Sequence, residues 1–269
     1  MEQRHPYLDG PYPRAYAHRG WHLDELAGCE NTLASFHRAV AEGFSYIELD
    51  VHSSVDGVAM VHHDRTLDRT TDGTGPLAHL PAAQIERAKV RGREPVPRLE
   101  HVLTELPDTR VTIELKSDAA VVPTLTALDR TAAWDRVCIG GYNERWLRRA
   151  RAGGGARLFT SMAQNSAFGL RGRAWLGALP APFSGLAELP VLPAVRGRLA
   201  QLPHRFGALT VVDSDLLRVA HDSDREVHVW TVNDPVQMGE LLDLGVDGLL
   251  SDRPDLLRDL LRDRGEWAA

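Results

Sequence analysis

The feature that most constrains this chain is a repeated alternation of short β-rich runs and amphipathic helical stretches. Runs rich in β-branched and aromatic residues predict strands at 14–18, 46–52, 111–116, 136–139, 157–160, 209–212, 226–232 and 248–251. Apolar residues at helical spacing predict helices at 31–42, 121–132, 143–151, 214–222, 235–244 and 254–263. Strands that alternate with helices are typical of a parallel sheet, so this order predicts an α/β fold.

The number of predicted strands favours a closed barrel over an open sheet. Eight strands in 269 residues fit a (β/α)8 TIM barrel, which takes about 250 residues. No GxGxxG motif follows the first strand, as an open dinucleotide-binding sheet would require. A run at 58–62 predicts a short β-hairpin after the second strand, and residues 163–206 predict a long loop region. We therefore expect a single domain over residues 1–269.

Composition excludes several classes of protein. The chain has 31 Lys and Arg against 37 Asp and Glu, and a net charge of -6 without basic runs disfavours nucleic-acid partners. Two cysteines cannot build a disulfide framework, which favours a reducing compartment. No signal peptide is visible, and no apolar stretch approaches the roughly 18 residues of a membrane span. We expect a cytoplasmic protein without integral membrane association, and its oligomeric state is left open.

Carboxylates lie on one face of two predicted strands. Because alternate side chains of a strand share a face, Glu48 and Asp50 point together in YIELDV, as do Glu114 and Lys116 in VTIELK. Apolar barrel residues turn toward the helices, so these carboxylates face inward, where burial is costly unless a cation meets them. Three oxygen ligands suit one hard divalent cation, Mg2+ or Ca2+. The alternative is a salt-bridged set with Lys116 and Arg19.

A histidine and an arginine end the first predicted strand. His18 is followed directly by Arg19, which places a titratable group beside a fixed cation. Such a pair is useful for binding a phosphate and for proton transfer, although a single histidine at a strand end is more often structural. The pair is therefore a candidate only in combination with the acidic strands.

The predicted hairpin brings a second histidine into consideration. If Asp56-Gly57 forms a two-residue turn, the pairing register extends to place His63 opposite Asp50. His62 would then point to the other face of the hairpin. A bulge in either strand would shift this register.

Taken together, these residues resemble the glycerophosphodiester phosphodiesterase family. The resemblance spans nearly the whole chain and includes further motifs in the same order: Glu30-Asn31-Thr32, Leu67 to Gly73 (LDRTTDG), Val96 to Glu100 (VPRLE), Trp230-Thr231-Val232-Asn233, Gly245 to Gly248 (GVDG) and Ser251 to Pro254 (SDRP). The family implies a TIM barrel, one divalent metal ion and hydrolysis of glycerophosphodiesters to sn-glycerol 3-phosphate and an alcohol.

The resemblance also implies roles for individual residues. By it, His18 and His63 form the acid/base pair, Glu48, Asp50 and Glu114 bind the metal, Arg19 and Lys116 contact the phosphate, and Trp230 is an aromatic near the pocket or in the core. Two features depart from the family pattern. The loop from Trp21 to Cys29 is longer than usual, and Gly140-Gly141-Tyr142 stands where Ser-Phe is common. Both departures concern the specificity for the alcohol more than the chemistry.

Two other functions remain open at this stage. A phospholipase-type barrel that cleaves lysophospholipids or phosphoinositides would use the same residues and would need an apolar rim. Trp175, Leu176, Leu179 and Phe183 could supply that rim or could belong to the core. A non-catalytic protein that binds a metal or a phosphodiester is the second alternative, and it is disfavoured because both histidines and all three carboxylates are present.

Overall fold

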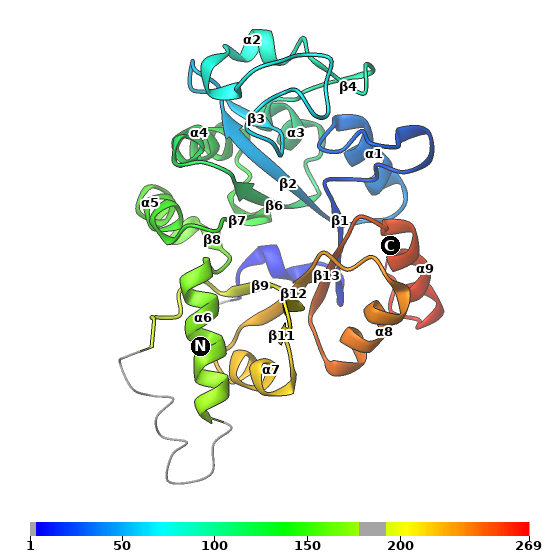
Figure 1. Ribbon diagram of the computed structural model, residues 1–269, viewed down its shortest axis with the longest axis vertical. Helices are drawn as coiled ribbons and strands as arrows, with labels where there is room; N and C mark the ends of the chain where they lie inside the picture. The colour runs from blue at the N-terminus through cyan, green and yellow to red at the C-terminus, as the bar shows by residue number, and fades with distance from the viewer. Residues whose placement is uncertain (1–3, 178–191, 269) are drawn as a thin grey trace.

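A parallel β-barrel wrapped by helices forms the centre of the computed structural model, which describes residues 4–177 and 192–268 (Figure 1). Neighbouring strands follow the order β8-β7-β6-β2-β1-β13-β12-β9, and a parallel bridge from Ser161 to Leu199 joins the two ends. The barrel strands are β1 Arg14–His18, β2 Tyr46–Ser53, β6 Arg110–Leu115, β7 Val137–Gly140, β8 Phe159–Thr160, β9 Leu199–Pro203, β12 Glu226–Trp230 and β13 Gly248–Ser251. The predicted (β/α)8 barrel is confirmed.

Helices connect the strands and pack on the outside of the barrel (Figure 1). They are α1 Leu33–Ala41, α3 Leu99–Glu105, α4 Val121–Thr131, α5 Glu144–Gly154, α6 Gln164–Gly177, α7 Ser214–His221, α8 Pro235–Leu244 and α9 Pro254–Asp263. Local sequence sets several ends: Thr32 and Ser35 form a capping box before α1, and Gly245 ends α8 in a left-handed conformation. Among the described residues, no helix has the length and apolar character needed to cross a membrane.

One predicted barrel strand was assigned to the wrong segment. The barrel uses β9, whereas residues 209–212 contribute only β11 Leu209–Thr210, which pairs with β10 Arg205–Phe206 outside the barrel. The β9 sequence LAQLP contains Gln201 and Pro203, which weaken its strand signal, whereas LTVV at 209–212 has the stronger β-propensity.

The predicted long loop at 163–206 is also wrong in part. It contains the whole of α6 as well as β9, while residues 178–191 lie outside the described part of the chain. The helix escaped prediction because glycines interrupt its apolar pattern. Gly169 is required there, since a Cβ atom at this position would lie 2.3 Å from the Pro193 carbonyl oxygen.

The hairpin after β2 is confirmed, but its predicted register is wrong by one residue. β3 Ala59–Val61 pairs antiparallel with β2 so that Val51 faces Val61, and the His62 amide donates to the Asp50 carbonyl at 2.9 Å. The Ser54 amide donates to the Val58 carbonyl, which makes the turn three residues long rather than two. The Ser54 hydroxyl also accepts from the Val58 amide and stabilises this longer turn.

Residues between β3 and α3 form an insertion with its own small core. It contains α2 Ala82–Ile85 and the paired strands β4 Lys89–Val90 and β5 Glu94–Pro95. Its apolar side chains form a cluster separate from the main core: Met60, Leu67, Leu77, Ala82, Ile85, Ala88, Val90 and Val96. The insertion thus packs largely on itself beside the end of the hairpin.

The lower, N-terminal end of the barrel interior is closed by a polar network. Tyr7, from a short 3-10 helix at Pro6–Asp9, places its hydroxyl 3.0 Å from Tyr16 Oη and 2.7 Å from Thr112 Oγ1. Tyr16 Oη lies 3.0 Å from His228 Nδ1, whose Nε2 lies 3.0 Å from Glu226 Oε2. Arg14 then pairs with Glu226 and donates to the Leu8 and Pro11 carbonyls. We call this set the lower network.

Candidate active site

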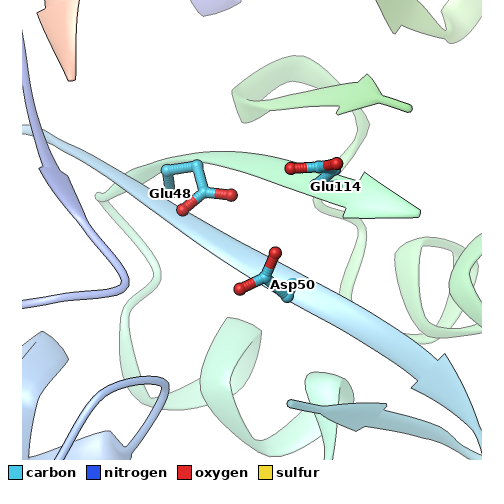
Figure 2. Close-up of side chains that lie close together, drawn as sticks. All are labelled: Glu48, Asp50 and Glu114. Atoms are coloured by element: carbon cyan, nitrogen blue, oxygen red, sulfur yellow. The ribbon is translucent and has the colours of Figure 1, made fainter. Parts of the chain in front are cut away.

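Three carboxylates meet at the upper, C-terminal end of the barrel interior (Figure 2). Asp50 of β2 lies directly beside Glu114 of β6 in the parallel register, and Glu48 precedes Asp50 on the same face. One oxygen of each carboxylate lies within 4.8 Å of the others. Asp50 and Glu48 are buried, and Glu114 is partly exposed. The inward alternation inferred from the sequence therefore brings all three together, where barrel enzymes carry out their chemistry.

Two cations and an amide surround the acidic cluster. Arg19 Nε lies 3.1 Å from Asp50 Oδ2, and Lys116 Nζ lies 3.1 Å from Asp50 Oδ1 and 3.4 Å from Glu114 Oε1. Asn31 Nδ2 donates to Asp50 Oδ2 at 2.8 Å. The salt-bridged arrangement considered from the sequence therefore does form. It is incomplete, because the buried Asp50 Oδ1 and Glu114 Oε1 accept no hydrogen bond of normal geometry.

The carboxylates of the cluster respond differently to this environment. Burial and the neighbouring Asp50 charge raise the pKa of Glu48 to about 8, and burial likewise raises the pKa of Glu114. Burial acts in the same direction on Asp50, but Lys116 and Arg19 outweigh it and lower the Asp50 pKa. Without a further cation, burial and mutual repulsion thus favour the protonated forms of Glu48 and Glu114.

His18 is held by a carboxylate from the neighbouring strand, because Asp252 directly follows β13, which pairs with β1. Its Nδ1 donates to Asp252 Oδ1 at 2.6 Å, which turns its Nε2 toward Glu48 Oε2 at 3.6 Å. Asn233 Nδ2 donates to the second Asp252 oxygen at 3.2 Å. Burial disfavours the His18 cation, but Glu48 and Asp252 outweigh burial and raise the His18 pKa. The His18–Asp252 pair therefore presents one fixed ring nitrogen to the acidic cluster.

His63 forms a second histidine–aspartate pair just after β3, the strand that pairs with β2. Its Nδ1 lies 2.6 Å from Asp64 Oδ1, and its side chain is 32% exposed. The His62 amide donates to the Asp50 carbonyl, so His63 directly follows the residue that pairs with this ligand candidate. His62 is buried, and its Nε2 bonds to the Thr66 carbonyl at 3.1 Å. The His63 ring is thus partly exposed beside Asp64, whereas the His62 ring is buried against Thr66. Strand alternation does not explain this difference, because β3 ends at Val61, before both histidines.

Trp230 lies at the inner wall of the mouth. It is partly buried, packs against the apolar side chains of the barrel interior and contacts the Tyr142 ring edge-to-face at 6.1 Å. Tyr142 is 54% exposed, and burial together with Glu114 raises its pKa. Trp230 therefore contacts the core on one side and the exposed Tyr142 on the other.

Several residues of the site were not assigned from the sequence. They are Glu30, Asn31, Asp64, Arg69, Asn233 and Asp252, together with His22, whose Nε2 lies 3.5 Å from Asp252 Oδ1. Most of these residues belong to the motifs by which the sequence resembles the family. No pattern in the neighbouring sequence, however, shows which side chains they contact. A second signal is visible only in the backbone: Arg19 and Asn31 have φ of 56° and 59°, a strained conformation that tends to mark functional sites.

Hard oxygen ligands beside fixed cations and two oriented histidines define a barrel hydrolase suited to an anionic ester such as a phosphodiester. Residues 18–256 match the sequence profile described as the glycerophosphoryl diester phosphodiesterase family, and the chain belongs to this family. It is therefore a phosphoric diester hydrolase, and glycerophosphodiester phosphodiesterase activity is supported.

Known relatives agree with this assignment. The chain is 39% identical over 253 residues to a probable glycerophosphodiester phosphodiesterase 2 of Mycobacterium tuberculosis, covering 94% of this chain and 92% of that protein. A putative glycerophosphoryl diester phosphodiesterase from Silicibacter pomeroyi shares the fold with a TM-score of 0.76 and 23% identity, covering 98% and 100% of the two chains. An Oleispira antarctica phosphodiesterase, solved with its product sn-glycerol-3-phosphate, has a TM-score of 0.73 at 22% identity over 93% and 97%.

Proposed function

We propose that this enzyme hydrolyses glycerophosphodiesters to sn-glycerol 3-phosphate and an alcohol with the help of one divalent cation, Mg2+ or Ca2+. The observation that carries the proposal is the cluster of Glu48, Asp50 and Glu114, in which two buried carboxylate oxygens have no hydrogen-bond donor of good geometry. Membership of the family supports the substrate class. The product found in the Oleispira antarctica relative supports sn-glycerol 3-phosphate as one of the two products.

The donor set of the cluster fits a hard cation. It offers carboxylate oxygens without thiolate or imidazole, the ligands that Mg2+ and Ca2+ prefer. Two of these oxygens, Asp50 Oδ1 and Glu114 Oε1, lack a hydrogen bond that burial normally demands. When bound, a divalent cation would neutralise charge that develops on the phosphate oxygens.

Arg19 and Lys116 would bind the remaining phosphate oxygens. Both cations border the cluster, and their guanidinium and ammonium groups already lie near carboxylate oxygens of Asp50. Arg19 offers a planar set of donors in fixed geometry, whereas Lys116 acts as a point charge. Their charges would stabilise the transition state because phosphodiester hydrolysis increases the negative charge at phosphorus.

The two histidines would transfer protons on either side of the phosphate. One removes a proton from the attacking oxygen and the other protonates the leaving alkoxide. The attacking oxygen belongs either to water or to the glycerol 2-hydroxyl, in which case a transient cyclic phosphate forms and is then opened by water. Asp252 bonds His18 Nδ1 and Asp64 bonds His63 Nδ1, so each ring has Nε2 available for this transfer. Trp230 would line the pocket beside the substrate. The assignment of acid and base to His18 and His63 is left to experiment.

A metal-by-substrate grid tests this proposal. Dialysed enzyme is assayed with chelator, Mg2+ or Ca2+ against glycerophosphocholine, glycerophosphoethanolamine and a lysophospholipid. Release of glycerol 3-phosphate is measured for the first two substrates and release of lysophosphatidic acid for the third. We expect no activity in chelator and recovery with at least one of the two ions. Full activity in excess chelator would contradict the metal requirement. No turnover of any diester under any condition would favour the non-catalytic binding protein instead.

A lysophospholipid substrate is the second candidate, and an apolar half of the rim favours it. Large apolar side chains are exposed on the segments that follow β7, β9 and β12, at the end of the barrel where the site lies: Tyr142 after β7, Phe206 in β10, Leu209 in β11 and Val236 at the start of α8. Tyr142 contacts Trp230, and Gln237 Nε2 of α8 lies 2.8 Å from His204 Nδ1, which joins the segments after β12 and β9. In the same grid, faster turnover of the lysophospholipid below its micellar concentration would support this candidate.

Of the apolar residues that the sequence suggested for the rim, Trp175 and Leu176 lie near the C-terminal end of α6. Trp175 is 48% exposed near the far end of α6, where the Arg171 guanidinium stacks on its ring at 4.8 Å. Leu179 and Phe183 lie outside the described residues. The single-domain organisation over residues 1–269 and the cytoplasmic location remain predictions from the sequence.

A further inference from the structure

The guanidinium of Arg69, in the insertion, binds two carboxylates. Its Nε and Nη2 lie 2.5 Å and 3.0 Å from the two oxygens of Asp64. Its Nη2 also donates to Glu30 Oε1 at 2.8 Å, and its Nη1 to Glu30 Oε2 at 3.3 Å. Two-point contacts of a guanidinium with a carboxylate fix the orientation of both groups more strongly than a single contact does. Arg69 thereby fixes the orientation of two acids simultaneously.

Each of these acids leads into the active site. Asp64 Oδ1 bonds His63 Nδ1 at 2.6 Å, and Glu30 Oε1 accepts from Arg19 Nη1 at 3.2 Å. One guanidinium outside the site is therefore connected to a proposed acid/base group through Asp64 and to a proposed phosphate contact through Glu30.

We propose that Arg69 is a positioning residue that sets the orientation of His63 through Asp64 and, by the same contact, holds Arg19 through Glu30. This inference rests on the proposed function of His63 and Arg19. The need for such a residue follows from the fold, because His63 lies after the end of β3 and not on a barrel strand. Its insertion packs around a separate apolar cluster and is joined to the hairpin by backbone bonds such as that from the Val61 amide to the Pro97 carbonyl, which leave the orientation of the His63 ring to its contact with Asp64.

The opposing interpretation is an ordinary surface salt bridge. The Arg69 side chain is 49% exposed, and exposed ion pairs contribute only about 0–1 kcal/mol to stability. The same insertion contains a matched control for this interpretation. Arg98 contacts both oxygens of Glu86 at 2.7 Å and is 42% exposed, but neither partner is joined to the site.

The test compares Arg69→Gln, Arg69→Lys and Arg98→Gln in steady-state kinetics with a glycerophosphodiester. Loss of a residue that orients a catalytic or ligating group typically costs about 10- to 100-fold. We expect Arg69→Gln to lower kcat by that factor, and Arg69→Lys, which keeps the charge but loses the two-point geometry, to recover only part of it. Arg98→Gln should stay within about twofold of wild type while losing a similar, small amount of thermal stability.

A double-mutant cycle with His63→Ala separates positioning from a structural effect. If Arg69 acts through both His63 and Arg19, Arg69→Gln should lower the residual kcat of the His63→Ala enzyme by a clearly smaller factor than it lowers the kcat of wild type, because only the contribution through Arg19 is left to lose. An equal factor in both backgrounds, or a kcat for Arg69→Gln within twofold of wild type, would overturn the inference. A His63→Ala enzyme with wild-type activity would instead overturn the proposed function, so the two failures are distinguishable.

Discussion

Both ends of the barrel interior are polar, but they differ in how their carboxylates are paired with cations and hydrogen-bond donors. In the lower network, Glu226 is partly buried, but His228 and Arg14 outweigh burial and lower its pKa to about 2. Its carboxylate is met by Arg14, His228 and the exposed Arg4. At the upper end, burial and Asp50 raise the pKa of Glu48 to about 8.

This difference distinguishes a binding site from a structural network on the same strands. Strands β1, β2, β6 and β12 contribute to both ends, so the backbone does not explain it. The lower network is closed, because its acid meets a guanidinium and an imidazole. The upper cluster leaves two buried acceptor oxygens, Asp50 Oδ1 and Glu114 Oε1, without a donor of good geometry. An incomplete network in a folded protein indicates where an external cation or substrate completes it.

The largest effect should come from removing one ligand at the upper end. Glu48→Gln, Asp50→Asn and Glu114→Gln should each lower kcat by roughly 1000-fold, since a catalytic metal supplies several kcal/mol of transition-state stabilisation. Isothermal titration should show weakened binding of Mg2+ or Ca2+. In chelator, Glu48→Gln should melt no lower than wild type, because the raised pKa of Glu48 keeps its carboxyl largely neutral and the amide replaces it without adding a buried charge. A lower melting temperature for Glu48→Gln would mean that the upper cluster stabilises the fold as the lower network does.

The next largest effect should come from replacing the histidines at the upper end, and it should distinguish His63 from His62. His63→Ala should lower kcat by roughly 100- to 10,000-fold, the range for an acid/base group, whereas His62→Ala should mainly lower stability. His18→Ala should fall in the same kinetic range as His63→Ala. A nitrophenyl phosphodiester, whose leaving group needs little protonation, should restore activity to the variant that lacks the acid and not to the other.

These histidine variants must fold and bind metal before their kinetics are compared. Circular dichroism and titration with the divalent ion serve as controls. Near-wild-type rates for both His18→Ala and His63→Ala on the natural diester would contradict the two-histidine mechanism. Failure of the nitrophenyl substrate to rescue either variant would contradict the assignment of the general acid to one of these two residues.

The sequence predicted the upper cluster well because its geometry is local. Period-two alternation in β2 and β6 places Glu48, Asp50 and Glu114 on the inner face, and the parallel register then brings the two strands together. Partners distant in the chain could not be found this way. His18 and Asp252 are 234 positions apart, and nothing in either segment identifies the other. The lower network was missed for the same reason.

Local reasoning failed where turn chemistry or burial outweighed propensity. The Ser54 side chain stabilises a three-residue turn that shifts the hairpin by one residue from the register that Asp56-Gly57 suggested. In β9, Gln201 points into the barrel and donates to Thr112 Oγ1 at 3.3 Å, so a polar residue occupies an interior strand position. Such a residue weakens the apolar pattern that predicts a strand.

The smallest effect concerns the lower network alone and should leave catalysis unchanged. The pKa of Glu226 falls to about 2 in the folded protein from 4.5, so its ionised form stabilises the fold above about pH 4.5. That stability, about 3 kcal/mol, is lost as the pH falls from 4.5 through 2. Glu226→Gln should therefore be less stable than wild type by about 3 kcal/mol at pH 7 and by only about 1 kcal/mol at pH 3, measured by urea unfolding. The exposed Glu240→Gln on α8 is the control and should show no such pH dependence. A kcat loss in Glu226→Gln comparable to that of the ligand variants would show that the two ends of the barrel are one functional unit.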